Sequence, residues 1–133
     1  MEIIKRTALA VTFFVLLPTL PAYAANWVYL TTTNNGTDIY YDADTIARSG
    51  NQVTVWEKLD HSRDKTFKQR QQTTLIRYDC AGRTRTLLHT ISYYPDGTNK
   101  SFTFETYEQE VDPIAPGTLG DGKLEAICAA TSP

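Results

Sequence analysis

The chain has 133 residues, a formal net charge of −2, 41% hydrophobic residues and two cysteines. This length allows one small domain beyond a leader segment, and the composition is that of a globular protein. The near-neutral charge argues against a general nucleic-acid binder, because phosphate contacts need concentrated positive charge.

Residues 1–24 have the order of a secretory signal peptide. Two positive charges precede an apolar stretch at residues 7–20, and the small residues Ala22 and Ala24 follow. The stretch is roughly 14 residues long, whereas a helix that spans a bilayer needs about 20. We therefore predict export, cleavage between Ala24 and Ala25, and no transmembrane segment.

Residues 25–133 are then predicted to form one domain. A lipid anchor requires a cysteine directly after the cut, and Ala25 and Asn26 stand there. No lipid anchor is therefore expected, and the predicted location is the periplasm or the outer cell surface.

Cys80 and Cys128 make an even count in an exported chain, which indicates a disulfide. The closed loop of roughly 48 residues would contribute about 4 kcal/mol. A redox-active or metal-binding pair is the alternative, but such pairs usually lie closer in sequence.

Segments rich in aromatic and β-branched residues alternate with turn residues along the domain. Strands are predicted at residues 27–31, 39–41, 53–59, 67–80, 84–94 and 101–106. A short turn is expected at residues 44–48.

A helix is predicted from about Gly120 to Ala130, with Leu124, Ile127 and Cys128 on one face at helical spacing. Alternation puts Ile76, Tyr78 and Cys80 on one face of a strand. The disulfide would join these two faces. The predicted fold class is α+β: an antiparallel sheet of about six strands, with a C-terminal helix packed on it and tied by one disulfide.

Few residues of the sequence are arranged in a way that indicates catalysis. His89 shares a predicted strand face with Leu87 and Ile91, which favours a hydrogen-bonded core histidine. His61 lies in a charged turn, predicted at residues 60–65, with no clear second set of metal ligands. The acidic residues of the C-terminal third are interpreted as a solvated loop rather than a carboxylate pair: Glu105, Glu108, Glu110 and Asp112. We predict no enzyme activity, no catalytic residues, no metal site and no cofactor.

Basic residues concentrate in the middle of the chain. The part of the predicted 67–80 strand before residue 73 is polar on both faces, so it is expected to project beyond the core. The cations of this region form the candidate ligand-binding site: Arg63, Lys65, Lys68 and Arg70. The alternative is a set of solvated charges balanced by the acidic C-terminal third.

Motifs spread over almost the whole domain resemble the surface-adhesin protein E-like family. They are Trp27, Tyr41–Asp42, Ile46, Arg48, Gly50–Asn51, Val53, Val55–Trp56, Lys58, Asp79–Cys80, Arg83, Arg85, Ile114, Pro116–Thr118 and Ile127–Cys128. The resemblance implies an antiparallel sheet with a disulfide-tied C-terminal helix, and Cys80 bonded to Cys128.

The resemblance also implies an outer-surface protein that binds host matrix and plasma proteins. The matching residues expected to keep the fold are Trp56, Asp79, Cys80, Pro116, Gly117 and Cys128. The expected partner is a host extracellular protein or, alternatively, another envelope component reached from the periplasm. A homodimer is a further expectation, because a small sheet leaves edge strands that can pair.

Overall fold

The computed structural model describes residues 10–12 and 25–132, so most of the predicted signal peptide lies outside the described residues. Eight strands form one antiparallel sheet in the order β1-β2-β4-β5-β6-β7, with β3 paired to β4 and β8 paired to β6. The strands are Trp27–Thr32 (β1), Asp38–Asp42 (β2), Ala47–Ser49 (β3), Gln52–Asp60 (β4), Gln71–Asp79 (β5), Thr84–Tyr93 (β6), Asn99–Thr103 (β7) and Val111–Pro113 (β8).

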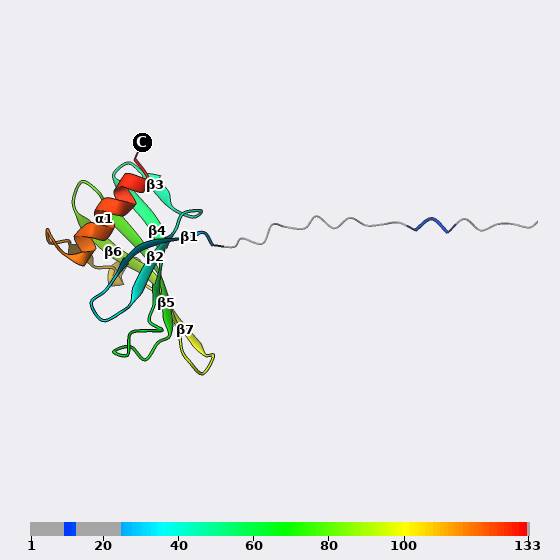
Figure 1. Ribbon diagram of the computed structural model, residues 1–133. Helices are drawn as coiled ribbons and strands as arrows, with labels where there is room; N and C mark the ends of the chain where they lie inside the picture. The colour runs from blue at the N-terminus through cyan, green and yellow to red at the C-terminus, as the bar shows by residue number, and fades with distance from the viewer. Residues whose placement is uncertain (1–9, 13–24, 133) are drawn as a thin grey trace, which may run out of the picture.

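One α-helix, α1 (Leu119–Ala130), packs on one face of this sheet. A single 3-10 turn, η1 (Thr106–Glu108), connects β7 to β8. In Figure 1, α1 lies over one end of the sheet, while the β6–β7 hairpin extends beyond it at the other end. The predicted α+β class is confirmed. The two strands beyond the six predicted, β3 and β8, are each three residues long.

Alternation along β4 and β5 builds the core under α1. The inward side chains of β4 and β5 meet those of α1, together with Ile114 just after β8, in an apolar cluster: Val53, Val55, Ile76, Tyr78, Ile114, Leu124 and Ile127. Full burial of one large aliphatic side chain contributes about 1.5–3 kcal/mol, so this cluster contributes substantially to the stability of the domain.

The disulfide joins the end of the sheet to the last turns of α1. Cys80 and Cys128 are bonded, with their Cα atoms 6.0 Å apart. The predicted structural disulfide is therefore confirmed. It fastens to the sheet the same helix that supplies Leu124 and Ile127 to the core.

Two arginines hold the ends of α1. Thr118 caps the first turn, where its hydroxyl accepts from the Asp121 amide at 3.3 Å. The Arg83 guanidinium forms an ion pair with Asp121. At the other end, Arg48 donates to the Cys128 carbonyl at 3.2 Å, where the helix dipole favours a cation.

The 67–80 strand is shorter than predicted. Residues 61–70 form a loop, and β5 begins at Gln71. The Asp64 carboxylate accepts hydrogen bonds from the backbone amide and the hydroxyl of Thr66, at 3.0 and 2.5 Å. Such a local turn competes with ladder hydrogen bonds, which explains why the chain is not extended here.

A β-bulge in β6 corrects the prediction for His89. Leu75 pairs with His89, whereas the next residue, Ile76, pairs with Leu87, so one extra residue stands in β6. Leu87 therefore faces α1, and His89 lies on the opposite face beside Trp56, with ring centroids 5.7 Å apart. The predicted core location is wrong. His89 is half-buried, although it is hydrogen-bonded, to Thr103 at 2.6 Å and Ser101 at 2.9 Å.

The face of the sheet opposite α1 carries a shallow concave surface of about 390 Å³, lined by Trp56, Leu75, Leu88 and Phe104 among others. Within the described residues, no helix has the length and apolar character needed to cross a membrane.

Candidate functional site

The predicted cationic residues all lie in the loop between β4 and β5, residues 61–70, which we call the basic loop. Arg63, Lys65, Lys68 and Arg70 are each exposed. The Arg70 backbone is fixed, because its amide donates to Tyr93 at 2.8 Å and its carbonyl accepts from the His61 amide at 2.9 Å. The loop is therefore anchored where it enters β5.

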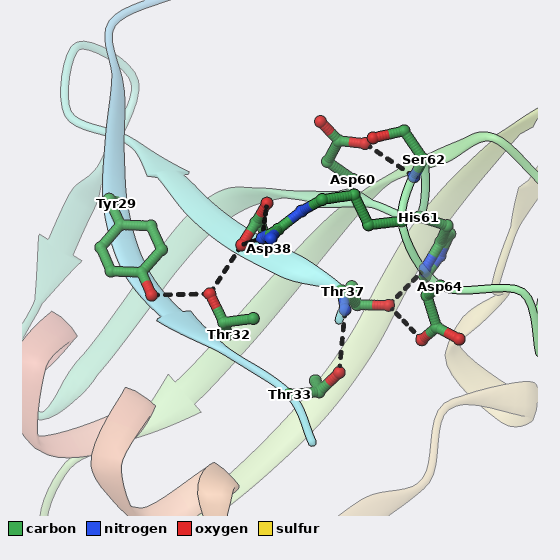
Figure 2. A network of polar contacts seen from close by, with 10 residues as sticks. Tyr29, Thr32, Thr33, Thr37, Asp38, Asp60, His61, Ser62 and Asp64 are labelled. Carbon is green, nitrogen blue, oxygen red and sulfur yellow. Dashed lines mark hydrogen bonds and ion pairs between the residues drawn. The ribbon is translucent and has the colours of Figure 1, made fainter. Parts of the chain in front are cut away.

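A buried polar cluster of Thr37, His61 and Asp64 anchors the first part of the basic loop, next to β4. His61 is only 3% exposed, so the side chain is buried within the charged turn predicted at residues 60–65. Its Nδ1 lies 2.8 Å from the Thr37 hydroxyl, and its Nε2 lies 2.9 Å from Gln72 Oε1. The Thr37 hydroxyl donates to Asp64 at 2.6 Å. Figure 2 shows Thr37, His61 and Asp64 pointing toward one another beneath the loop.

An aromatic ring covers this cluster. Phe67 stacks on the His61 imidazole at 3.8 Å between centroids, with the ring planes 12° apart. Phe67 remains 44% exposed, so one face of the pair is open to solvent. The stacking explains the burial of His61, because it removes one face of the ring from water.

Hydrogen bonds stabilise the ionised carboxylate of Asp64. The hydroxyls of Thr37 and then Thr66 hold the pKa of Asp64 below its ordinary value, and the effect outweighs partial desolvation. Asp64 therefore stays charged in the folded protein below the pH at which an exposed carboxyl would accept a proton.

One member of the cationic set is already neutralised. Arg63 donates to both oxygens of Asp38 at 2.8 Å. Asp38 also accepts from Thr32 at 2.6 Å, a hydroxyl that in turn contacts Tyr29 (Figure 2). Among the described residues, Lys65, Lys68 and Arg70 form no ion pair.

The acidic residues of the C-terminal third surround η1 and β8. Glu105, Glu110 and Asp112 are exposed, and Glu108 is half-buried. The Glu108 carboxylate accepts from the Glu105 amide at 3.1 Å, which caps the short turn. Across the described parts of the chain, three or more metal-ligating side chains do not gather at any point.

A second buried polar cluster, which sequence reasoning missed, lies beneath α1. Glu57 is fully buried, and its Oε1 accepts from the Lys123 ammonium at 2.8 Å. The Tyr78 hydroxyl donates to the other carboxylate oxygen. Burial, and then the Glu57 charge, raise the pKa of Tyr78 far above its ordinary value. The sequence did contain one signal for this cluster: Glu57 alternates with Val55 and Leu59 in β4, so it shares their inward face.

Fold and surface together define a small disulfide-tied α+β protein with an exposed basic loop and no assembled catalytic group among its described residues. The sequence profile of the Surface-adhesin protein E family matches residues 27–129. The chain belongs to this family, as the sequence motifs indicated. Family membership points to a non-enzymatic, adhesin-like envelope protein, and to an exported or surface location.

Solved structures of Haemophilus influenzae protein E have a similar fold. Crystal form II is 16% identical with a TM-score of 0.56, and the match covers 83% of this chain and 94% of that one. A second structure of the same protein is 15% identical with a TM-score of 0.54, covering 85% and 91%. Protein E from non-typeable Haemophilus influenzae is 16% identical with a TM-score of 0.53, covering 83% and 81%. No curated protein sequence matches the chain significantly.

Proposed function

We propose that this protein is an exported, non-enzymatic binder of the cell envelope that attaches to host matrix or plasma proteins. Membership of the surface-adhesin family supports the class of function. The observation that carries the proposed site is the basic loop, where three exposed cations have no ion-pair partner among the described residues.

The chemistry of the basic loop suits an acidic partner. Lys65, Lys68 and Arg70 offer positive charge on a loop that backbone hydrogen bonds anchor at Asp64 and Arg70, which reduces the backbone entropy lost on binding. Acidic protein segments and sulfated glycosaminoglycan-like chains are the matching ligands. Binding through exposed charges is screened by salt, so the affinity falls as ionic strength rises.

Charge reversal tests this site. The chain from residue 25 onward is applied to immobilised heparin and to matrix proteins, together with a triple variant, Lys65→Glu, Lys68→Glu and Arg70→Glu. We expect the triple variant to lose binding and to unfold at an unchanged temperature. Arg63→Ala combined with Asp38→Ala is a control within this region, since it removes an ion pair without changing the net charge, and Lys100→Glu on β7 is a control elsewhere. Equal binding by the triple variant would reject the site.

The cellular location of the protein tests whether it is an adhesin. We propose that residues 1–24 are a signal peptide removed after Ala24, which the mass of the exported chain would verify. Cleavage of the protein by protease on intact cells supports adhesion. Protection from protease combined with release by osmotic shock contradicts it.

The second candidate is an accessory protein that docks onto another envelope component in the periplasm. The concave surface opposite α1 favours it, because Trp56 and Phe104 there are aromatic groups of the kind enriched in protein interfaces, with the apolar Leu75 beside them. Leu75→Glu would disrupt such docking and leave heparin binding intact. A homodimer through an edge strand, β1 or β7, is a separate proposal that light scattering of the purified chain tests.

A further inference from the structure

A cavity of about 220 Å³ opens between α1 and the sheet, away from the basic loop. Its apolar wall consists of Leu59, Ile76 and Leu87, and its polar wall includes Glu57, Thr74 and Lys123. One water molecule occupies about 30 Å³ in the liquid, so the space admits several waters or one small organic molecule.

Among the described residues, Thr74 contributes an unpaired buried hydroxyl to the wall of this cavity. The residue is 8% exposed, and its hydroxyl is a buried side-chain oxygen without a hydrogen-bond partner among the described residues. Leaving a buried hydroxyl without a hydrogen-bond partner destabilises the folded protein. Valine has nearly the same shape and would avoid that cost. The threonine hydroxyl therefore lowers stability unless a molecule in the cavity forms a hydrogen bond with it.

Lys123 supplies further donors in the same place. Its side chain is 7% exposed, and its ammonium carries three protons, one of which goes to Glu57 Oε1. Both oxygens of Glu57 are engaged, by Lys123 and Tyr78. Within the described part of the chain, the polar wall therefore offers unpaired N–H donors at the Lys123 ammonium and an unpaired hydroxyl at Thr74. The Glu57 carboxylate in the same wall already accepts hydrogen bonds at both oxygens.

The charges around the cavity balance. Glu57 and Asp112 are acidic, Lys123 and Arg85 are basic, and all four line it. A ligand carboxylate would bring another anion beside Glu57, and a ligand ammonium would bring another cation beside Lys123. An uncharged hydrogen-bond acceptor meets the spare donors without adding charge beside the buried Glu57–Lys123 pair.

We propose that the cavity between α1 and the sheet binds a small uncharged carbonyl compound, such as an amide, with its oxygen at Thr74 and Lys123 and its aliphatic body against Leu59, Ile76 and Leu87. The site is separate from the basic loop, so it operates whether or not that loop binds host proteins. The protein thereby gains a small-molecule function in addition to adhesion.

Three probes of equal length test the proposal on the chain from residue 25 onward. Hexanamide, hexanoate and hexylammonium are titrated at millimolar concentration, and the amide and methyl NMR signals of the protein are followed. We expect hexanamide to shift the signals of Leu59, Thr74, Ile76 and Leu87 with saturation. Hexanoate and hexylammonium should bind at least threefold more weakly. Signals that do not shift with hexanamide, or equal binding of all three probes, would overturn the proposal.

Thr74→Val separates ligand binding from folding. The variant should weaken hexanamide binding about three- to tenfold, the effect of one hydrogen bond, while the unfolding temperature stays equal or rises. Thr73→Val, the same change on the opposite face of β5, is the control and should bind hexanamide as the parent does. Undiminished binding by Thr74→Val would refute the assignment of the hydroxyl.

Discussion

Two buried polar clusters lie against the same face of the sheet, one beneath α1 and one beneath the basic loop. The cluster beneath α1 is ionic: Lys123 and Glu57 are 66 residues apart in the chain and meet inside the apolar core. The cluster beneath the loop is a relay of short contacts, in which one hydroxyl, that of Thr37, contacts both His61 and Asp64. Both satisfy buried polar groups, but they depend on different parts of the fold.

This difference between the two clusters predicts how substitutions in each of them affect stability. The Lys123–Glu57 pair exists only when α1 is docked on the sheet, so it reports on the global fold. The Thr37 cluster depends on the first strands and on the loop next to them. We therefore expect substitutions beneath α1 to destabilise the whole domain, and substitutions beneath the loop to affect mainly the loop.

The largest effect is expected from Lys123→Met. Removing one partner leaves the Glu57 carboxylate buried without its cation, which costs about 3–5 kcal/mol. Urea unfolding of the single variant measures the loss. The double variant Lys123→Met with Glu57→Met removes both charges and should recover most of the stability. A double variant as unstable as the single one would show that packing, not charge, dominates at this site.

Loss of the disulfide should come next. Replacing Cys80 and Cys128 by alanine should lower the free energy of unfolding by about 2–5 kcal/mol, because the unfolded chain gains the freedom of a long loop. Urea unfolding measures the change, and dithiothreitol added to the parent protein should reproduce it. If α1 remains as protected from hydrogen exchange as before, the bond does not hold the helix in place.

A smaller loss is expected from Thr37→Val. The substitution leaves Asp64 and His61 each without a buried partner, at a cost of about 1–3 kcal/mol. Thermal unfolding measures it. Thr66→Val removes an exposed partner of the same carboxylate and is the control, with a smaller expected loss. Equal effects from both variants would contradict the central role of Thr37.

The acid sensitivity of the loop cluster should be modest and specific. The pKa of Asp64 is lowered in the folded state, chiefly by the Thr37 hydroxyl, from an unfolded value of about 3.9. Its contribution is therefore present above that value and is lost as the pH falls through the lower folded pKa. Urea midpoints at pH 7 and pH 3 should differ less for Asp64→Asn than for the parent. Asp44→Asn, at an exposed carboxyl, should retain the full difference.

The smallest effect is expected from Arg63→Ala. Its ion pair with Asp38 is exposed, and such pairs contribute little in water. Thermal unfolding in low salt should show no measurable change. A clear loss of stability would mean that Arg63 also orders the basic loop.

Alternation and turn chemistry were sufficient to predict the main strands, the helix and the disulfide, because each rests on a local pattern or a residue count. Alternation in β4 offered a signal for the inward place of Glu57 that was not used, and its partner Lys123 could not be predicted, since that contact requires the docked helix. One extra residue in β6 reversed the face of His89, and no sequence signal marked it. His61 is buried by Phe67 and Thr37, which meet it only in the folded chain.

The basic loop lay in the segment that the sequence indicated, and its cations are exposed as expected. The sequence did not predict the neutralisation of Arg63, because Asp38 is 25 residues away and approaches only through the pairing of β2 with β4. The cavity beneath α1 gave no signal either, because its lining comes from several strands and the helix.

The late position of α1 in the chain sets the order in which the fold can close. A polypeptide that is synthesised from its N-terminus presents every strand before Leu124, Ile127 and Cys128 arrive. Until then the inward face of the sheet has no cover, Glu57 has no cation, and Cys80 has no sulfur to join. The core is therefore completed by the last residues of the domain to be made.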